Sequence, residues 1–129
     1  MRAVILAGGR GARLAPFSSV IPKPLLPVGY RPILEIIFNQ LAAAGFTRAT
    51  LSLGYMSSYF RTFLAEHRAL RRLLSIDFVE EREPTGTAGS LAMVPDLEGS
   101  FLVMNGDILT DLDYAAFMRD HEQSGATIT

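Results

Sequence analysis

The hydrophobic positions of this chain fall into short continuous runs that alternate with longer stripes at helical spacing. The short runs are typical of strands that a sheet buries. Such segments cover residues 3–6, 49–53 and 101–104, and a further one occupies residues 126–129. Residues 75–80 are also predicted to form a strand, because apolar and polar side chains alternate there. Because the segment at 126–129 is still in progress where the sequence stops, we expect the chain to be a truncated piece of something longer.

Helical stripes lie between these strands, and local signals mark where they begin and end. Side-chain oxygens cap a first helical turn, proline fits there because its missing N–H costs nothing, and glycine ends a helix. The predicted helices begin at Pro32, at Ser57 or Ser58, at Thr87, and at Thr110 or Asp111. The first ends at Gly45, the third at Val94 and the fourth near Gln123, before Gly125. Asp111 and Asp113 are attributed to capping rather than to a metal pair.

Strands and helices alternate along the whole chain, which predicts an α/β layer fold with a mostly parallel sheet and right-handed crossovers. The 129 residues suit one domain or a large piece of one, and the 49% apolar content is enough to bury a core. We find neither an internal repeat nor a low-complexity linker. Residues 1–129 are therefore interpreted as a single unit.

Composition and charge exclude several classes of function. A net charge of −1 provides no attraction for nucleic acid or for an anionic membrane. The lack of cysteine excludes a disulfide scaffold, a thiolate metal site and a cysteine nucleophile. The N-terminus does not have the pattern of a signal peptide, and no apolar stretch reaches the roughly 18–20 residues that span a bilayer. We expect a cytoplasmic protein without nucleic-acid or membrane partners, and the sequence is compatible with a homo-oligomer.

The sharpest motif is the loop Leu-Ala-Gly-Gly-Arg-Gly-Ala-Arg-Leu at residues 6–14, directly after a buried strand. Its glycines let the backbone approach a ligand and turn N–H groups toward phosphate oxygens, and Arg10 and Arg13 add positive charge. It is not a P-loop, because the chain has no Gly-Lys pair, and Leu14 stands where the dinucleotide fingerprint needs its third glycine. The loop therefore predicts another kind of phosphate site, the alternative being a tight turn with surface arginines.

Two further residues are candidates for the same site. Lys23 lies between Pro22 and Pro24, whose fixed backbone angles hold its ammonium as a point charge suited to phosphate. Asp107 follows the buried run 101–104, so it lies at the carboxyl end of a strand, where α/β sheets bind ligands. Taken alone, Lys23 is compatible with a solvated loop, and Asp107 with a turn or a helix cap.

Together these motifs resemble the nucleoside-diphosphate-sugar pyrophosphorylases, and most of all the sugar-phosphate guanylyltransferases such as mannose-1-phosphate guanylyltransferase. The likeness covers the whole chain, with the family's motifs in order. They are the glycine-rich loop at 6–14, Pro-Lys-Pro-Leu-Leu-Pro-Val-Gly at 22–29, Glu-Pro-Thr-Gly-Thr-Ala-Gly-Ser at 83–90 and Asn-Gly-Asp at 105–107. The resemblance implies a Rossmann-like three-layer α/β/α fold, of which residues 1–129 would be the N-terminal, nucleotide-binding part.

The resemblance also implies a reaction and its residues. An oxygen of a sugar 1-phosphate attacks the α-phosphorus of a nucleoside triphosphate in line, and pyrophosphate leaves, so positioning and charge stabilisation dominate. Arg13 would hold the β- and γ-phosphates, Lys23 would contact the reacting phosphates, and Asp107 would ligate Mg²⁺. The residues implied in nucleotide binding are Leu6, Ala7, Gly8, Gly9, Gly11, Ala12, Arg13, Lys23, Glu81, Gly86 and Asn105.

Glu81 lies where the family's base-reading side chain is expected. Guanine presents two donors, N1–H and the N2 amino group, and a carboxylate matches them, whereas uracil or thymine suits an amide better. Glu81 therefore favours GTP, with Gly86 letting the backbone lie against the base. The alternative is that Glu81 belongs to a solvated, charged strand end.

Two departures from the family qualify these expectations. Ala12 replaces the threonine usual between the last loop glycine and the arginine, so a hydroxyl contact is lost. Family catalytic domains are longer, and the sugar-binding segment and a second metal-binding aspartate would lie beyond Thr129.

Two alternative functions remain open. One is a nucleotidyltransferase of the same fold acting on a non-sugar phosphate, of the cytidylyltransferase or molybdenum cofactor guanylyltransferase type. The other is a non-catalytic nucleotide-sensing subunit. Intact Arg13, Lys23 and Asp107 favour catalysis.

Overall fold

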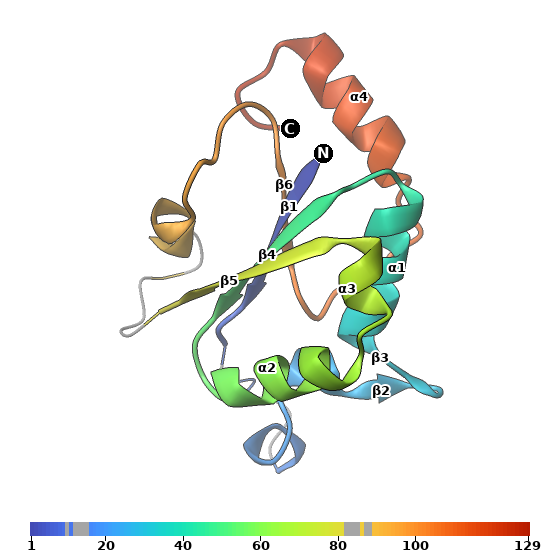
Figure 1. The fold of residues 1–129 in the computed structure, drawn as a ribbon. Coiled ribbons are helices and arrows are strands. Elements are labelled where there is room, and N and C mark those ends of the chain that lie inside the picture. The colour runs from blue at the N-terminus through green and yellow to red at the C-terminus, as the bar shows by residue number, and fades with distance from the viewer. Residues whose placement is uncertain (10, 12–15, 82–85, 87–88) are drawn as a thin grey trace.

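A four-stranded parallel sheet forms the centre of the molecule in a computed structural model that describes residues 1–9, 11, 16–81, 86 and 89–129 (Figure 1). Its strand order is β5-β4-β1-β6. The strands are β1 (Arg2–Ala7), β4 (Arg48–Leu53), β5 (Ser75–Glu80) and β6 (Leu102–Asn105). These are the first four strands that the apolar patterns predict, so the expected parallel α/β sheet is confirmed.

β1 lies in the middle of the sheet and pairs with β4 on one side and with β6 on the other. Ile5, for example, is in register with Leu51 and with Met104. Successive strands are added on one side of β1, and the chain then crosses back to place β6 on the other side. Such a change of direction leaves a crevice beyond the carboxyl ends of the strands, and ligands of open α/β sheets bind there.

The remaining elements are four α-helices, three short 3-10 helices and a small hairpin within the described part of the chain. The α-helices are α1 (Ile33–Ala43), α2 (Ser57–Glu66), α3 (Leu70–Leu73) and α4 (Tyr114–Ser124). The 3-10 helices are η2 (Phe17–Ser19), η3 (Lys23–Leu25) and η4 (Gly89–Met93). The antiparallel hairpin pairs β2 (Pro27–Val28) with β3 (Arg31–Pro32).

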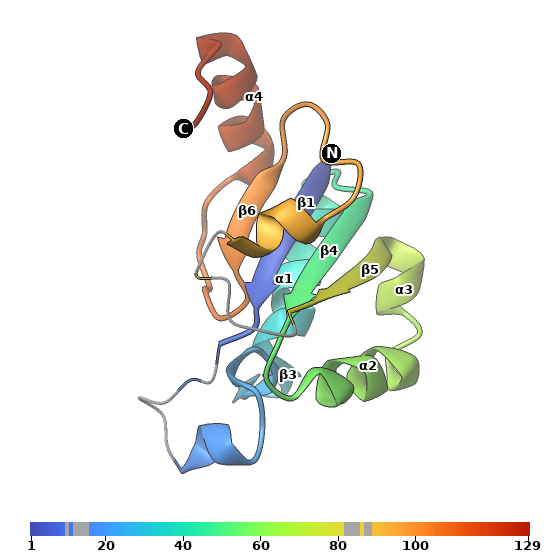
Figure 2. The same ribbon diagram turned by 90° about the vertical axis from the view of Figure 1, so that its left-hand side faces the viewer.

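The two faces of the sheet differ in polarity and in covering. One face buries the side chains at alternate positions of the central strands, such as Ile5 and Leu51, in a core shared with all four α-helices. The opposite face carries η4, as Figure 2 shows by placing η4 in front of the strands and α1 behind them. The side chains of Thr50 and Ser52 on this second face are buried and polar.

Two expected helix caps are wrong, because other residues occupy the cap positions. Met56, at φ 61°, occupies the cap position of α2, and the Ser57 hydroxyl donates instead to the Glu80 carboxylate. The last helix begins at Tyr114 rather than after Thr110 or Asp111. Its cap is Asp113, whose carboxylate accepts the Ala116 N–H at 2.9 Å, so the attribution of Asp113 to capping is confirmed.

Three other expectations need correction. Residues 126–129 form no strand, because their apolar pattern finds no neighbouring strand to pair with, and Thr129 Oγ1 lies instead 2.7 Å from His121 Nδ1. The helix expected over 87–94 is the 3-10 helix η4 in its described part, and residues 87–88 lie outside the described residues. Pro32 precedes α1 and pairs in β3 rather than forming the first helical turn.

Candidate functional site

A cleft of about 500 Å³ opens at the carboxyl ends of the strands. β1 supplies its floor, the turn after β6 one wall, and the residue after β5 another. The lining residues are Leu6, Ala7, Gly8, Gly9, Gly11, Lys23, Pro24, Glu81, Gly86, Asn105 and Asp107. Every described residue to which the sequence assigns nucleotide binding or catalysis is in this set, and the structure thus brings them together. Ala12 and Arg13 lie outside the described residues, as does Arg10.

The glycine-rich loop leaves β1 through a very close approach to the end of β4. The Gly8 carbonyl accepts the Tyr55 N–H at 3.3 Å, and a Cβ placed on Gly54 would stand 2.9 Å from the same Gly8 oxygen. A side chain at Gly54 would therefore displace the loop. Sequence analysis missed Gly54, although a glycine directly after a buried strand was an available signal.

Lys23 and Asp107 form an ion pair inside the cleft, with 2.5 Å between Lys23 Nζ and Asp107 Oδ2. Their side chains are 38% and 29% exposed, so both charges remain open to a ligand. Lys23 is the only lysine in the sequence, where the other eleven cationic side chains are arginines. A compact ammonium is thus present at the one place where an aspartate and the glycine-rich loop converge.

Gly106 makes this pairing possible, because the turn after β6 packs against η3. Its N–H donates to the Leu6 carbonyl at 2.9 Å. A Cβ at Gly106 would lie 3.2 Å from both Pro24 Cγ and Ile5 Cγ2, which is too tight for a backbone held on two sides. The absence of a side chain therefore lets Asp107 approach Lys23, the residue before Pro24.

Glu81 enters the cleft from the chain just beyond β5. Its N–H continues the ladder by donating to the Leu53 carbonyl at 2.8 Å. Its carboxylate oxygen Oε1 accepts a hydrogen bond from Ser52 Oγ at 3.1 Å. A Cβ at Gly8 would stand 3.2 Å from the same Oε1, so the carboxylate lies directly beside the glycine-rich loop. The expectation of a freely solvated strand end does not describe this environment.

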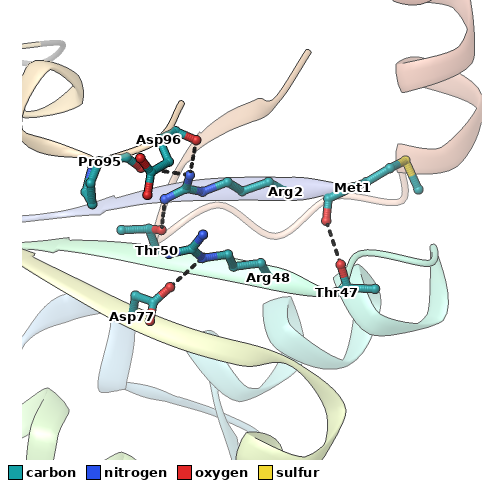
Figure 3. Close-up of polar contacts among 8 residues, drawn as sticks. All are labelled: Met1, Arg2, Thr47, Arg48, Thr50, Asp77, Pro95 and Asp96. Carbon is teal, nitrogen blue, oxygen red and sulfur yellow. Dashed lines mark hydrogen bonds and ion pairs between the residues drawn. The ribbon is translucent and has the colours of Figure 1, made fainter. Parts of the chain in front are cut away.

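The segment that follows η4 is tied to the polar face of the sheet by Arg2 (Figure 3). Arg2 Nη1 donates to the carbonyls of Pro95 and Asp96 at 2.9 and 2.7 Å, and Nη2 donates to Thr50 Oγ1 at 3.1 Å. Beside it, Arg48 Nε pairs with Asp77 Oδ2 at 2.6 Å. These contacts lie toward the amino ends of the strands, away from the cleft lining.

The cleft is compatible with Mg²⁺, which typically takes one or two protein carboxylates and completes its shell with phosphate oxygens and water. Asp107 supplies a carboxylate at the cleft wall. In the part of the chain that the structure describes, no three His, Cys, Asp or Glu side chains gather into a metal-binding group. A magnesium site here would therefore combine the Asp107 carboxylate with oxygens of a bound nucleotide.

Comparison with known proteins agrees with this arrangement. Residues 2–129 match the protein family described as nucleotidyl transferase. The chain belongs to the nucleotidyl transferase family. The match spans nearly the whole chain and so includes the four strands of the sheet, β1, β4, β5 and β6.

Individual relatives place the chain near the sugar-phosphate guanylyltransferases. It is 35% identical to mannose-1-phosphate guanylyltransferase of Mycobacterium tuberculosis (strain ATCC 25618 / H37Rv), over 98% of this chain and 35% of the relative. It is 38% identical to mannose-1-phosphate guanyltransferase beta-B of Xenopus laevis, over 97% of this chain and 36% of the relative. The chain thus spans about a third of the length of these curated relatives.

A solved structure supports the fold. HddC from Yersinia pseudotuberculosis superposes with a TM-score of 0.81 at 34% identity, over 93% of this chain and 53% of HddC. The same protein has been solved in complex with GMP-PN, and that structure superposes with a TM-score of 0.79 at 33% identity.

None of the helices in the described residues has the length and apolar character needed to cross a membrane.

Proposed function

We propose that the protein containing this chain transfers a guanylyl group from GTP to a sugar 1-phosphate and releases pyrophosphate, with Mg²⁺ as cofactor. The observation that carries the proposal is the meeting of the glycine-rich loop, the Lys23–Asp107 pair and Glu81 in one cleft. The names of the relatives, guanylyltransferases of mannose 1-phosphate, support the same reaction class.

In this reaction an oxygen of the sugar phosphate forms a bond to the α-phosphorus of GTP, and the bond from that phosphorus to the bridging oxygen breaks. Pyrophosphate carries away the bonding electrons as negative charge. The protein's contribution is to hold the groups in line and to stabilise this charge. Backbone N–H groups of the glycine-rich loop would face the phosphates, and Arg13 would hold the β- and γ-phosphates.

Lys23 and Asp107 would change partners when the nucleotide arrives. At 2.5 Å the two charges neutralise each other. In the complex, the Lys23 ammonium would turn to the phosphate oxygens at the reacting centre. The Asp107 carboxylate would hold Mg²⁺, which supplies shielding of the phosphate charge when it is bound.

Glu81 would read the base. Its carboxylate lies at the cleft wall beside Gly8, and guanine alone among the common bases presents an N1–H next to an amino group. That HddC was solved with GMP-PN, a guanine nucleotide, supports this choice. Gly86, at φ 81°, also lines the cleft, and a side chain there would be strained.

The test is nucleotide binding and turnover in the full-length protein. Calorimetric titration with GTP, UTP, dTTP, CTP and ATP, each with and without Mg²⁺, should show selective and Mg²⁺-dependent binding of GTP. Selective binding of a pyrimidine triphosphate would contradict the guanine assignment and leave the reaction class intact. If pyrophosphate release requires a non-sugar phosphate as the acceptor, the assignment of a sugar 1-phosphate as substrate is wrong.

Lys23→Ala and Asp107→Ala should each lower the rate of pyrophosphate release by about 10²-fold or more, since each removes a charge at the reacting phosphates. Circular dichroism should show that both variants remain folded. The matched control is Arg61→Gln, which also removes a cation paired with a carboxylate, but one in α2 that does not line the cleft. Turnover close to that of the unmodified protein in the Lys23 or Asp107 variant would contradict the role given to that residue.

A further inference from the structure

A serine is buried in the middle of the sheet, directly below the cleft. Ser52 is 0% exposed and lies near the end of β4, in register with Leu6 on one side and Val79 on the other. Its strand neighbours Leu51 and Leu53 face the apolar core beneath α1. A hydroxyl at such a position is costly unless it has a hydrogen-bond partner, because burial removes it from water.

The partner that Ser52 has is the side chain assigned to base recognition. Ser52 Oγ lies 3.1 Å from Glu81 Oε1, and because an ionised carboxylate can only accept, the hydroxyl is the donor. Nothing in the sequence pattern connects the two residues, which are 29 positions apart. Parallel pairing of β4 with β5 brings them together, since Leu53 is in register with Glu80, the residue before Glu81.

We propose that Ser52 is a positioning residue for nucleotide selectivity: its hydroxyl fixes the Glu81 carboxylate in the orientation that reads guanine. The inference rests on the proposed function, in that it takes Glu81 as the base-reading side chain. It concerns a residue outside the cleft lining, which acts only through Glu81.

Three contacts restrain Glu81 from different directions. Its backbone is held by the hydrogen bond from its N–H to the Leu53 carbonyl, at 2.8 Å. Its carboxylate is bonded to Ser52 and lies against Gly8, where even an added Cβ would come within 3.2 Å of Oε1. A free glutamate samples many rotamers, and restraining them before the ligand arrives lowers the entropic cost of binding.

Orientation matters for this carboxylate because guanine presents two parallel donors. A carboxylate satisfies both only when its two oxygens lie in the plane of the base, and each oxygen has two lone-pair directions. Oε1 can therefore accept from Ser52 and still accept from the base. Removing the Ser52 hydroxyl leaves Glu81 present and charged but without the hydrogen bond that orients Oε1.

The predicted signature is a loss of selectivity that leaves the phosphate contacts intact. The probes are GTP and inosine triphosphate, which lacks only the exocyclic amino group of guanine, so that the ratio of their dissociation constants isolates recognition of that group. In the full-length protein, Ser52→Ala should shrink this ratio by about tenfold, mainly by weakening GTP binding. Ser52→Thr, which keeps the hydroxyl, should restore it toward the value of the unmodified protein.

The chain offers a matched control on the same strand. Thr50 lies two residues before Ser52 on the same face of β4, is 1% exposed, and bonds Arg2 instead of a cleft residue. Thr50→Val removes a buried hydroxyl without touching Glu81, so it should leave the ratio unchanged. Glu81→Gln, which abolishes the carboxylate, sets the ratio expected when base recognition is lost.

The outcomes separate the two proposals. A reduced ratio in both Ser52→Ala and Glu81→Gln, with Thr50→Val unchanged, supports the inference. A reduced ratio in Glu81→Gln alone, or equal losses for both nucleotides in Ser52→Ala, overturns the role of Ser52 and leaves guanine reading by Glu81 in place. An unchanged ratio in Glu81→Gln overturns guanine reading, and the role of Ser52 with it.

Discussion

At the scale of single residues, this cleft depends on missing side chains as much as on charges. Gly54 and Gly106 each stand where a Cβ would collide with backbone or with a ring atom of a neighbouring element. The first allows the glycine-rich loop to leave β1, and the second allows Asp107 to reach Lys23. Both positions therefore favour glycine, since a side chain there would require neighbouring atoms to shift.

Tyr114 carries a residue-scale prediction that is independent of the cleft. It is 4% exposed, packs edge-on against Phe46, and its hydroxyl is buried with no hydrogen-bond partner among the described residues. Burial raises the pKa of the Tyr114 phenol above its ordinary value. The folded state therefore keeps the phenol neutral at alkaline pH at which the unfolded state ionises.

The sign of the pH effect follows from proton linkage. Because the pKa of Tyr114 is higher in the folded state, its contribution to stability is complete below about pH 10 and is lost as the pH rises through the folded value. We predict that urea denaturation shows a larger fall in the free energy of unfolding between pH 8 and pH 10.5 for the unmodified protein than for Tyr114→Phe. At pH 8 the variant should lie within about 1 kcal/mol of the unmodified protein, since no hydrogen bond is lost.

Tyr30→Phe is the control for this measurement, because that ring is 105% exposed. It should show the same alkaline fall as the unmodified protein. Equal pH dependence of Tyr114→Phe and Tyr30→Phe would contradict the prediction.

At the scale of elements, one arginine on the polar face of the sheet connects two strands to the segment that follows η4. Arg2 bonds two successive carbonyls, at Pro95 and Asp96, and the Thr50 hydroxyl, and so attaches the chain after η4 to β1 and β4. Asp96 has φ 54°, a left-handed conformation that is unfavourable for a non-glycine residue. The guanidinium therefore stabilises a turn that local preferences alone oppose.

We predict that Arg2→Met lowers the free energy of unfolding by about 1–2 kcal/mol, because three hydrogen bonds to partly exposed groups are lost while the apolar stem is kept. Urea denaturation measures the loss. Arg31→Met is the control, since Arg31 makes only an exposed pair with Glu35 at 3.8 Å, and it should cost under about 0.5 kcal/mol. Equal effects of the two substitutions would show that the Arg2 contacts do not stabilise the fold.

At the scale of the whole molecule, the described sheet is well covered on one face and lightly on the other. The α-helices pack on the face of Ile5 and Leu51, whereas η4 and the residues after it cover part of the opposite face. Val103 of the edge strand β6 remains 39% exposed. The curated relatives are about three times as long as the chain, which leaves room in them for segments that cover this face.

We predict that the 129-residue chain on its own releases pyrophosphate at less than about one hundredth of the rate of a longer protein that contains it, because closing a site around both substrates contributes factors of this size. Release assays on both proteins at equal concentration, with GTP and mannose 1-phosphate, measure the ratio. Comparable rates would mean that these 129 residues already contain the contacts for the sugar phosphate.

Much of this molecule follows from local patterns in the sequence. The runs at 3–6 and 101–104 are strands because continuous apolar residues are stable only between two covered faces. The glycine-rich loop follows the first of them, and its Gly11 has φ 61°, a conformation that favours glycine. Asp107 could be assigned to the ligand edge because parallel strands direct their carboxyl ends to the same edge. Lys23 could be assigned to the same site through its flanking prolines, and Glu81 and Gly86 through the resemblance to the family's motifs.

Other features were decided by the tertiary structure alone, because they depend on contacts between residues that are distant in the chain. Ser57 bonds Glu80 instead of capping α2, and residues 126–129 form no strand, because each outcome depends on which partner comes within reach. The same holds for the bond between Ser52 and Glu81. Sequence by itself determined the four strands of the sheet and the edge at which a ligand would bind. Three-dimensional proximity decided that residues 126–129 add no fifth strand and which hydroxyl orients which carboxylate, since a hydrogen bond forms only between groups within about 3 Å.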